Sequence, residues 1–343
     1  MKRKGVLTVI IGIALVLVLA LALPLMSACA PTPPTPPPAA EKVYKVCITQ
    51  IATHPDLDAN RQGIMDAMAE KGFIEGKNLQ LIIRNAEGDM TAAASIADYF
   101  VSVKPDLIHA ITTPSAQTVV AAAKGTNIPI VFSSVTDPVT AGLVPSWTQA
   151  APNVTGVSDW FEMPPQVEFI KSVLPNIKVL GICYNAGEVN AAVQATELKA
   201  TAPKYGLTIV EATAATTADV YAAGMSLVGR CDAVWIPTCN TVGGVGIESI
   251  IKVGEENKLP IFGSAEGMIG HGLIGGCSVN YYWIGQQAGY IAARILKGES
   301  IAGIPPMKSA VKTVVYPEAA ARMGVTVPQA VIDKADIVIK PTS

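Results

Sequence analysis

Two short stretches of the chain share one order of residue types: NIPIVFSS at residues 127–134 and KLPIFGSA at residues 258–265. In each stretch a Pro precedes a short apolar run, and small residues that include Ser follow it. Such a run, with turn signals at its ends, is typical of a strand that is buried on both faces of a parallel sheet. The recurrence predicts two lobes of similar construction.

The sequence around the first stretch alternates strands with helices. We predict strands at residues 46–51, 79–83, 107–111 and 128–132, and helices at 58–71, 91–102 and 115–124. This alternation is typical of right-handed βαβ crossovers and a parallel sheet, so the fold class is α/β with doubly wound lobes.

The same alternation surrounds the second stretch. We predict helices at 165–174, 191–205, 218–227 and 246–257, and strands at 179–184, 208–212, 233–236 and 259–262. Beyond the apolar run at 273–277, a helix at 283–296 and a strand at 312–316 are left over. We expect this remainder to cross back to the first lobe and return, which makes a hinge.

The N-terminus has the three parts of a secretory signal. Lys2-Arg3-Lys4 precede an apolar run at residues 6–23, and Met26-Ser27-Ala28-Cys29 close it. Small residues directly before a Cys are the signature of a bacterial lipoprotein cleavage site, which makes Cys29 the lipid-bearing terminus. The alternative is an uncleaved membrane anchor, because the run is about long enough to span a bilayer. Either way, we expect the rest of the chain to lie outside the cytoplasm, tethered to the bacterial cell membrane.

Composition narrows the class of protein. Residues 30–40 are rich in Pro and predict an extended spacer, and the remaining 300 or so residues are long enough for two domains. Three of the 25 Lys and Arg lie in the signal, so 22 basic residues face 27 acidic ones, a net charge of −5. This balance excludes a nucleic-acid-binding protein.

Five cysteines follow Cys29: Cys47, Cys183, Cys231, Cys239 and Cys277. An odd number leaves at least one unpaired, and the spacings match no zinc pattern. We expect most to be buried free thiols, with Cys231 and Cys239 as the pair to test for a disulfide. The three histidines lie far apart in the sequence, so we expect neither a metal nor a cofactor.

Polar residues follow nearly every predicted strand. Ligands of parallel sheets bind beyond the carboxyl ends of the strands, so these positions are the candidates for a binding site. They comprise Gln50 and residues 112–115 and 133–138 in the first half, and residues 185–190, 238–241 and 264–266 in the second.

This set suits an amphoteric small molecule. Hydroxyls and helix N-terminal amides can hold a carboxylate, while Asp137, Glu188 or Glu266 can neutralise an ammonium group. The alternative is that Ser115, Asn190 and Thr241 only cap the helices they precede. Tyr281, in an aromatic cluster, either stacks on a ligand or packs the hinge.

Motifs spread through the chain resemble one family. They are residues 70–78 (EKGFIEGKN) with Gly63, 104–108 (KPDLI), 129–138 (PIVFSSVTDP), 153–159 (NVTGVSD), Tyr184-Asn185 with Gly187-Glu188, and Tyr281-Tyr282 with Gly285. In this order they resemble substrate-binding lipoproteins of ABC importers, of the two-lobed type linked to uptake of tryptophan, tyrosine and phenylalanine. The chain departs from the family pattern at Cys239, where a carboxylate is usual, and at Ala186, where Pro is usual; both departures bear on which ligand is bound.

The resemblance implies a type I periplasmic-binding-protein fold with a three-crossing hinge. It divides the chain into a signal at 1–28, a lipidated Cys and tether at 29–42, an N-terminal lobe at 43–156 plus 279–309, and a C-terminal lobe at 157–278 plus 310–343. The residues it implies at the ligand are Thr113, Ser115, Ser134, Thr136 and Asp137 from one lobe, and Asn185, Glu188, Asn240, Thr241 and Glu266 from the other. Gln50, Asn190 and Tyr281 complete the predicted site.

We therefore predict a monomeric, lipid-anchored receptor that closes two lobes over a small ligand, an amino acid with an aromatic or large apolar side chain, and delivers it to an ABC permease. Ligand that bridges the lobes favours the closed state, and no covalent chemistry is needed. One alternative is a binding module that senses the ligand and feeds a membrane signalling receptor. An extracytoplasmic enzyme is disfavoured, because no nucleophile–base pair or metal cluster is apparent in the sequence.

Overall fold

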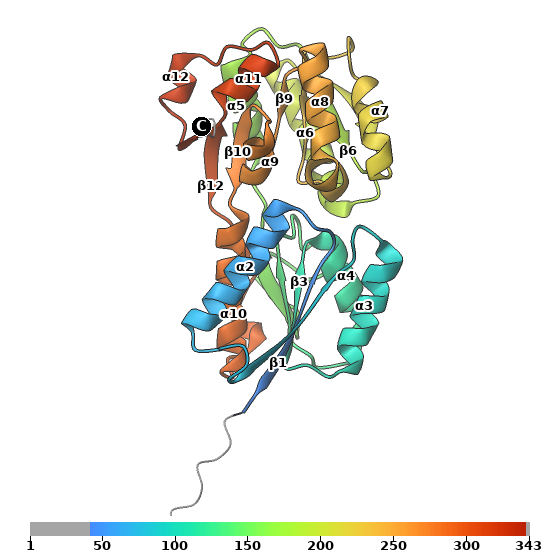
Figure 1. Cartoon of the computed structure of the whole chain (residues 1–343), viewed down its shortest axis with the longest axis vertical. Helices are drawn as coiled ribbons and strands as arrows, with labels where there is room; N and C mark the ends of the chain where they lie inside the picture. Colours follow the sequence, from blue (N-terminus) through green and yellow to red (C-terminus); the bar gives the residue numbers. More distant parts are fainter. Residues whose placement is uncertain (1–41, 341–343) are drawn as a thin grey trace, which may run out of the picture. The chain divides into compact units, whose positions relative to one another are not determined.

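The computed structural model describes residues 42–340 of the chain (Figure 1). The signal sequence, Cys29 and the Pro-rich spacer lie outside these residues, so their roles remain predictions. Within residues 42–340, no helix is both long and apolar enough to cross a membrane.

The N-terminal lobe is built on one six-stranded sheet, in which every neighbouring pair of strands is parallel. Its order is β11 (Met307–Lys308), β5 (Val154–Ser158), β4 (Ile130–Ser133), β3 (Leu107–Ile111), β1 (Tyr44–Gln50) and β2 (Leu79–Asn85). The three central strands β3, β4 and β5 are buried along their whole length. The helices of this lobe are α2 (Pro55–Glu70), α3 (Met90–Ser102), α4 (Thr113–Ala122) and α10 (Tyr281–Leu296).

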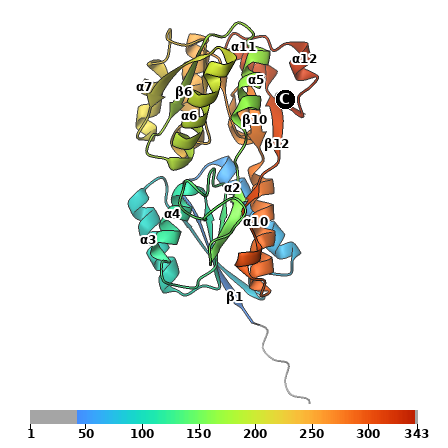
Figure 2. The same ribbon diagram turned by 180° about the vertical axis from the view of Figure 1, so that it is seen from behind.

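Helix α10 comes from the C-terminal part of the chain but packs on α2 in the N-terminal lobe. In Figures 1 and 2 the orange α10 lies beside the blue α2. Glycines allow this approach, because a Cβ at Gly285 would lie 1.9 Å from the carbonyl oxygen of Asn60, and one at Gly63 would lie 2.2 Å from that of Tyr282. The two helix backbones are therefore in direct contact.

The C-terminal lobe contains two smaller sheets. One is parallel, with the order β7 (Thr208–Thr213), β6 (Val179–Tyr184), β8 (Ala233–Trp235) and β9 (Ile261–Phe262). The other has the order β10 (Gly275–Val279), β12 (Val311–Val315) and β13 (Ile337–Val338), with β10 and β12 antiparallel. Its helices are α5 (Met163–Val173), α6 (Val189–Thr201), α7 (Val220–Met225), α8 (Ile247–Asn257), α9 (Glu266–His271), α11 (Pro317–Arg322) and α12 (Gln329–Ile332).

The chain crosses between the lobes three times. It leaves the first sheet after β5, returns between β10 and α10, and leaves again between β11 and β12. The predicted α/β fold with two doubly wound lobes and a three-crossing hinge is confirmed. Strand β5 keeps residues up to Ser158 in the first sheet, where the sequence placed the change of lobe after residue 156.

Each strand predicted up to residue 262 is present, with ends that differ by a few residues. The predicted helix at 191–205 is shorter, because α6 ends at Thr201 and a 3-10 turn containing Pro203 follows. Strand β5 and the short helix α9 were missed. Strand β5 was missed because Gly156 interrupts its apolar pattern. The structure requires Gly there, since a Cβ would lie 2.1 Å from the carbonyl oxygen of Phe132.

Candidate functional site

A cavity of about 470 Å³ lies between the strand ends of the two lobes. From the N-terminal lobe it is lined by loops after β1 and β2 and by Pro114 and Gln117 of α4. From the C-terminal lobe it is lined by the loops after β6, β7 and β8. Four predicted residues belong to this lining: Asn185, Glu188, Asn240 and Thr241. The strand-end rule thus selected some of the loops that line this cavity, those after β1, β6 and β8, but not those after β2 and β7.

The first turn of α4 carries polar side chains that have no partner. Thr113 and Ser115 are each 1% exposed, and their hydroxyl oxygens make no hydrogen bond within the described residues. Thr112, directly before the helix, has φ +79°, a conformation that is costly for a Thr. Because the N-terminus of a helix attracts negative charge, this turn is suited to hold a carboxylate.

Ser134 and Thr136 follow β4, the next strand in the sheet. The hydroxyl of Ser134 accepts a hydrogen bond from the Asn60 amide at 2.7 Å, so Asn60 fixes its position. The hydroxyls of Thr136 and Thr238 are 3.1 Å apart and join the two lobes. Thr136 therefore lies where the lobes meet, while the hydroxyl of Ser134 is held within its own lobe.

Asp159 was not among the predicted site residues, although it follows β5 at the same edge of the sheet. It is 1% exposed; its Oδ2 accepts a hydrogen bond from the Tyr281 hydroxyl at 3.0 Å, while its Oδ1 has no partner among residues 42–340. Burial raises the pKa of Asp159 to about 6. The strand-end rule would have found it, had 154–158 been predicted as a strand.

Tyr281 begins α10 just after a hinge crossing, and its hydroxyl binds Asp159 beside another crossing. Burial and then the nearby carboxylates of Asp159, Asp56 and Glu188 raise the pKa of Tyr281 well above its usual value. Its hydroxyl is thus a neutral donor that holds two hinge segments together. Within residues 42–340 its ring stacks on no other aromatic ring.

The carboxylate of Glu188 organises the C-terminal side of the cavity. It accepts hydrogen bonds from Asn190, from the backbone and side chain of Asn240, from the backbone and side chain of Thr241, and from the Cys239 thiol. With its oxygens used in this way, Glu188 shapes the loops of the site rather than offering a free charge. Asn190 keeps a buried Oδ1 without a partner, and Asn185 donates to Thr241 at 2.9 Å.

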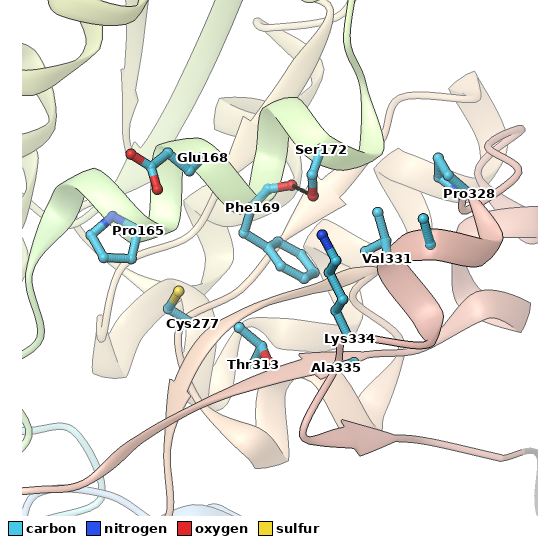
Figure 3. Close-up of a pocket in the computed structure, with 11 residues that line it drawn as sticks. Pro165, Glu168, Phe169, Ser172, Cys277, Thr313, Pro328, Val331, Lys334 and Ala335 are labelled. Atoms are coloured by element: carbon cyan, nitrogen blue, oxygen red, sulfur yellow. Dashed lines mark hydrogen bonds between the residues drawn. The ribbon is translucent and has the colours of Figure 1, made fainter.

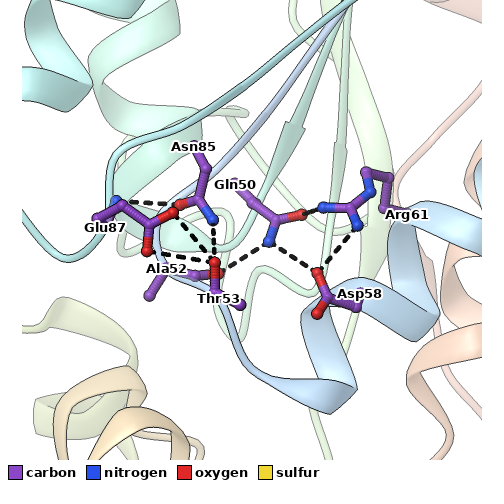
Figure 4. Close-up of polar contacts among 7 residues, drawn as sticks. All are labelled: Gln50, Ala52, Thr53, Asp58, Arg61, Asn85 and Glu87. Carbon is purple, nitrogen blue, oxygen red and sulfur yellow. Dashed lines mark hydrogen bonds and ion pairs between the residues drawn. The ribbon is translucent and has the colours of Figure 1, made fainter.

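Gln50 is buried, but its side chain is used inside its own lobe. Its amide nitrogen donates to the carbonyl of Ala52 at 2.9 Å and to Asp58 at 3.1 Å, and its oxygen accepts from Arg61 (Figure 4). These contacts position the loop after β1, so the structure does not offer the Gln50 amide to a ligand.

Asp137 and Glu266 do not line this cavity. Its lining also leaves out Thr113, Ser115, Ser134, Thr136, Asp159, Asn190 and Tyr281. Asp137 caps its own turn by accepting from the backbone of Val139 and the hydroxyl of Thr140, and it lines a separate surface pocket beside α6. Glu266 accepts a hydrogen bond from Asn280 at 2.8 Å. Neither is the buried carboxylate with a free oxygen that Asp159 is.

The start of α2 touches the C-terminal lobe at two glycines. Asp56 accepts a hydrogen bond from the backbone of Gly267 at 3.1 Å, and the ring of His54 lies against Gly244, where a Cβ would be 2.8 Å from it. Burial lowers the pKa of His54 to about 4, so the ring is neutral at pH 7. Contacts at α2 and the Thr136–Thr238 pair thus bring the lobes together on two sides.

A second cavity of about 470 Å³ lies within the C-terminal lobe (Figure 3). Phe169, Val331 and Ala335 give it an apolar wall, and it contains none of the predicted ligand residues. Cys277 lines this cavity and is a free thiol. The other four cysteines of the described residues are also free thiols. Cys231 and Cys239 therefore form no disulfide here. Across residues 42–340 no cluster of three His, Cys, Asp or Glu side chains could hold a metal ion.

Comparisons with known proteins agree with this architecture. Residues 45–339 match the family described as ABC transporter substrate binding protein. A tyrosine-binding protein of Clostridioides difficile (strain R20291) is 39% identical over 266 residues, which is 78% of this chain and 76% of that protein.

Two solved structures also resemble the chain. The ABC domain in complex with L-Trp from Streptococcus pneumoniae is 32% identical, covers 87% of this chain and 100% of its own, and has a TM-score of 0.83. The ligand-free, open structure of a substrate binding protein with adhesive properties from Clostridium difficile is 36% identical. It covers 88% of this chain and 100% of its own, with a TM-score of 0.66. These relatives are binding proteins and not enzymes, as the sequence predicted. The chain thus belongs to the ABC transporter substrate-binding protein family.

Proposed function

We propose that the protein is a lipoprotein anchored through Cys29 outside the cytoplasm, which captures an amino acid with an aromatic or large apolar side chain and delivers it to an ABC permease. The observation that carries the amino-acid ligand is the pair of unpartnered hydroxyls on Thr113 and Ser115 at the α4 N-terminus. They are suited to the ligand's carboxylate, because the helix end adds backbone donors and a favourable dipole.

The relatives support a ligand with an aromatic side chain, since one is a tyrosine-binding protein and another was solved in complex with L-Trp. The cavity supplies apolar surface for such a group through Ile51, Met90, Pro114 and Val245. The lobe arrangement supports capture by closure. The chain is more similar in structure to the L-Trp complex than to the ligand-free, open protein, although it is more identical in sequence to the latter.

The ligand can be identified from the purified protein. We expect mass spectrometry of the molecule released on denaturation to find an aromatic amino acid, and thermal shift with the twenty amino acids to give the same compound. Ligand at about 100 times its dissociation constant adds roughly 2.7 kcal/mol of stability, which is readily measured. Stabilisation by none of the twenty would contradict an amino-acid ligand.

Closure itself can be tested at Gly267. A Gly267→Ala substitution would place a Cβ 2.2 Å from Asp56 Oδ1, so the Asp56 carboxylate must move and lose its hydrogen bond between the lobes. Overpacking and a lost hydrogen bond cost about 1–2 kcal/mol, so we expect roughly tenfold weaker ligand binding in calorimetry.

The matched control for this variant is Gly270→Ala on the same helix α9, where an added Cβ meets nothing within 4 Å. Equal affinities of the two variants would show that the Asp56–Gly267 contact does not limit closure.

A further inference from the structure

Asp159 is a buried acid with an oxygen that the protein leaves unpaired. Its Oδ1 has no hydrogen-bond partner, and none of the ion pairs among the described residues includes Asp159. A carboxylate this deeply buried is costly unless a cation or several donors compensate its charge. The Thr136 hydroxyl and the Tyr281 hydroxyl both lower the pKa of Asp159, and Tyr281 donates to Oδ2, so Oδ1 is the oxygen without a partner.

The position of Asp159 relative to α4 fits the two ends of one small molecule. Strands β3, β4 and β5 are neighbours in the sheet, and Thr113, Thr136 and Asp159 follow them in turn at the same edge. Neighbouring strands lie about 4.8 Å apart, so the acid and the α4 N-terminus are separated by roughly 10 Å of backbone. The unpartnered hydroxyls of α4 favour a negatively charged group, and the unpartnered oxygen of Asp159 favours a positively charged one.

We propose that Asp159 is the subsite for the ligand's ammonium group, with Tyr281 as the residue that positions it, and that this subsite restricts the ligand to α-amino acids over carboxylic acids that lack the amine. This inference rests on the proposed function and refines it. Glu188, the acid of the opposite lobe that the sequence suggested for this role, has its oxygens occupied by its own loops.

The test compares L-tyrosine and L-tryptophan with their counterparts that lack the amine, 3-(4-hydroxyphenyl)propionate and 3-(indol-3-yl)propionate, by calorimetry on the wild type and on Asp159→Asn. Loss of a buried charge pair is expected to weaken amino-acid binding by about 100-fold or more. The wild type should discriminate against the amine-free acids by a similar factor, and Asp159→Asn should bind those acids about as the wild type does.

The outcomes separate the two levels of the proposal. If the wild type binds an aromatic amino acid but Asp159→Asn binds it equally well, the ammonium subsite is wrong and the proposed function stands. Equal wild-type affinity for the amine-free acids also overturns the subsite. If the wild type binds neither amino acid, both the proposed aromatic ligand and the ammonium subsite at Asp159 are wrong.

Folding of the variant does not decide the test. In the ligand-free protein Asp159→Asn removes a buried charge, so its Tm at pH 7.5 should equal or exceed that of the wild type. Should the variant not fold, the discrimination measured on the wild type and the variant Tyr281→Phe still apply. Tyr281→Phe should weaken amino-acid binding about tenfold, since Asp159 loses its one hydroxyl partner on α10.

A pH profile distinguishes positioning from a merely structural role. Asp159 must be ionised to pair with an ammonium group, and its pKa is about 6, so amino-acid affinity should fall as the pH drops from 7.5 to 5. The hydrogen bond from the Tyr281 hydroxyl lowers the pKa of Asp159. Tyr281→Phe removes that bond, so the midpoint of the profile should move to higher pH.

The other titratable groups around the pair are Asp56 on α2, Glu188 before α6 and, near Glu188, His54. Burial raises the pKa of Asp56 to about 6 as well, so Asp56→Asn, which keeps an acceptor for Gly267, is the control. A fall in affinity that persists in Asp56→Asn supports the assignment to Asp159, and one that disappears overturns it.

Discussion

A Glu188→Gln substitution is expected to lower the free energy of unfolding by about 3–5 kcal/mol, the scale on which a buried, hydrogen-bonded charge is disrupted. Glu188 is 8% exposed and accepts from donors on three other residues of its lobe besides Asn190: Cys239, Asn240 and Thr241. Gln has the same shape but replaces one acceptor oxygen with a donor. One side of the group would then set donor against donor, and buried N–H groups would lose their partner.

The same change should abolish ligand binding, because the loops after β6 and β8 line the cavity and meet at this carboxylate. Chemical denaturation would measure the stability, and calorimetry the binding. Glu197→Gln is the matched control, since Glu197 is exposed on α6 and a surface change there should alter stability by no more than about 0.5 kcal/mol. Equal denaturation midpoints for the two variants would rule out this role for Glu188.

The second large effect is expected at Gly285, where α10 crosses α2. Gly285→Ala would put a Cβ 1.9 Å from the backbone oxygen of Asn60, which cannot rotate away. Ala is favoured over Gly in a helix by about 1 kcal/mol, but separating two packed helix backbones costs more, about 3 kcal/mol or above. The cost of the clash should therefore exceed the gain in helix propensity, and the free energy of unfolding should fall by at least about 2 kcal/mol.

Ligand binding should report the same displacement. Helix α2 starts beside Asp56, and α10 starts at Tyr281, so moving one helix relative to the other disturbs both the contact between the lobes and the hydrogen bond to Asp159. Gly303→Ala, where an added Cβ meets nothing within 4 Å, is the control for both denaturation and calorimetry. If Gly285→Ala had the stability and ligand affinity of the wild type, the two helices would be able to separate without a cost in free energy.

Local patterns were sufficient to predict most of the framework. Apolar runs between turn signals identify β1, β3, β4 and β6, because a strand buried on both faces needs a continuous apolar stretch. The same reasoning failed at β5. Gly156 stands opposite Phe132 in the neighbouring strand, and the need for a residue without a side chain there is set by the sheet and not by the local pattern.

The sequence by itself determined the α/β class, the two lobes and some of the loops that line the cavity, since all three follow from periodicity and from the direction of parallel strands. Only the tertiary structure decided which polar atoms in those loops are free. Glu188 and Gln50 have the residue types of ligand contacts, but other residues occupy them: Arg61, 11 positions along the chain, for Gln50, and Thr241, 53 positions along, for Glu188. The hydroxyls of Thr113 and Ser115 and Oδ1 of Asp159 are left without a partner among the described residues. Whether a buried polar atom has a partner depends on which chain segments fold next to it, and that information is not local.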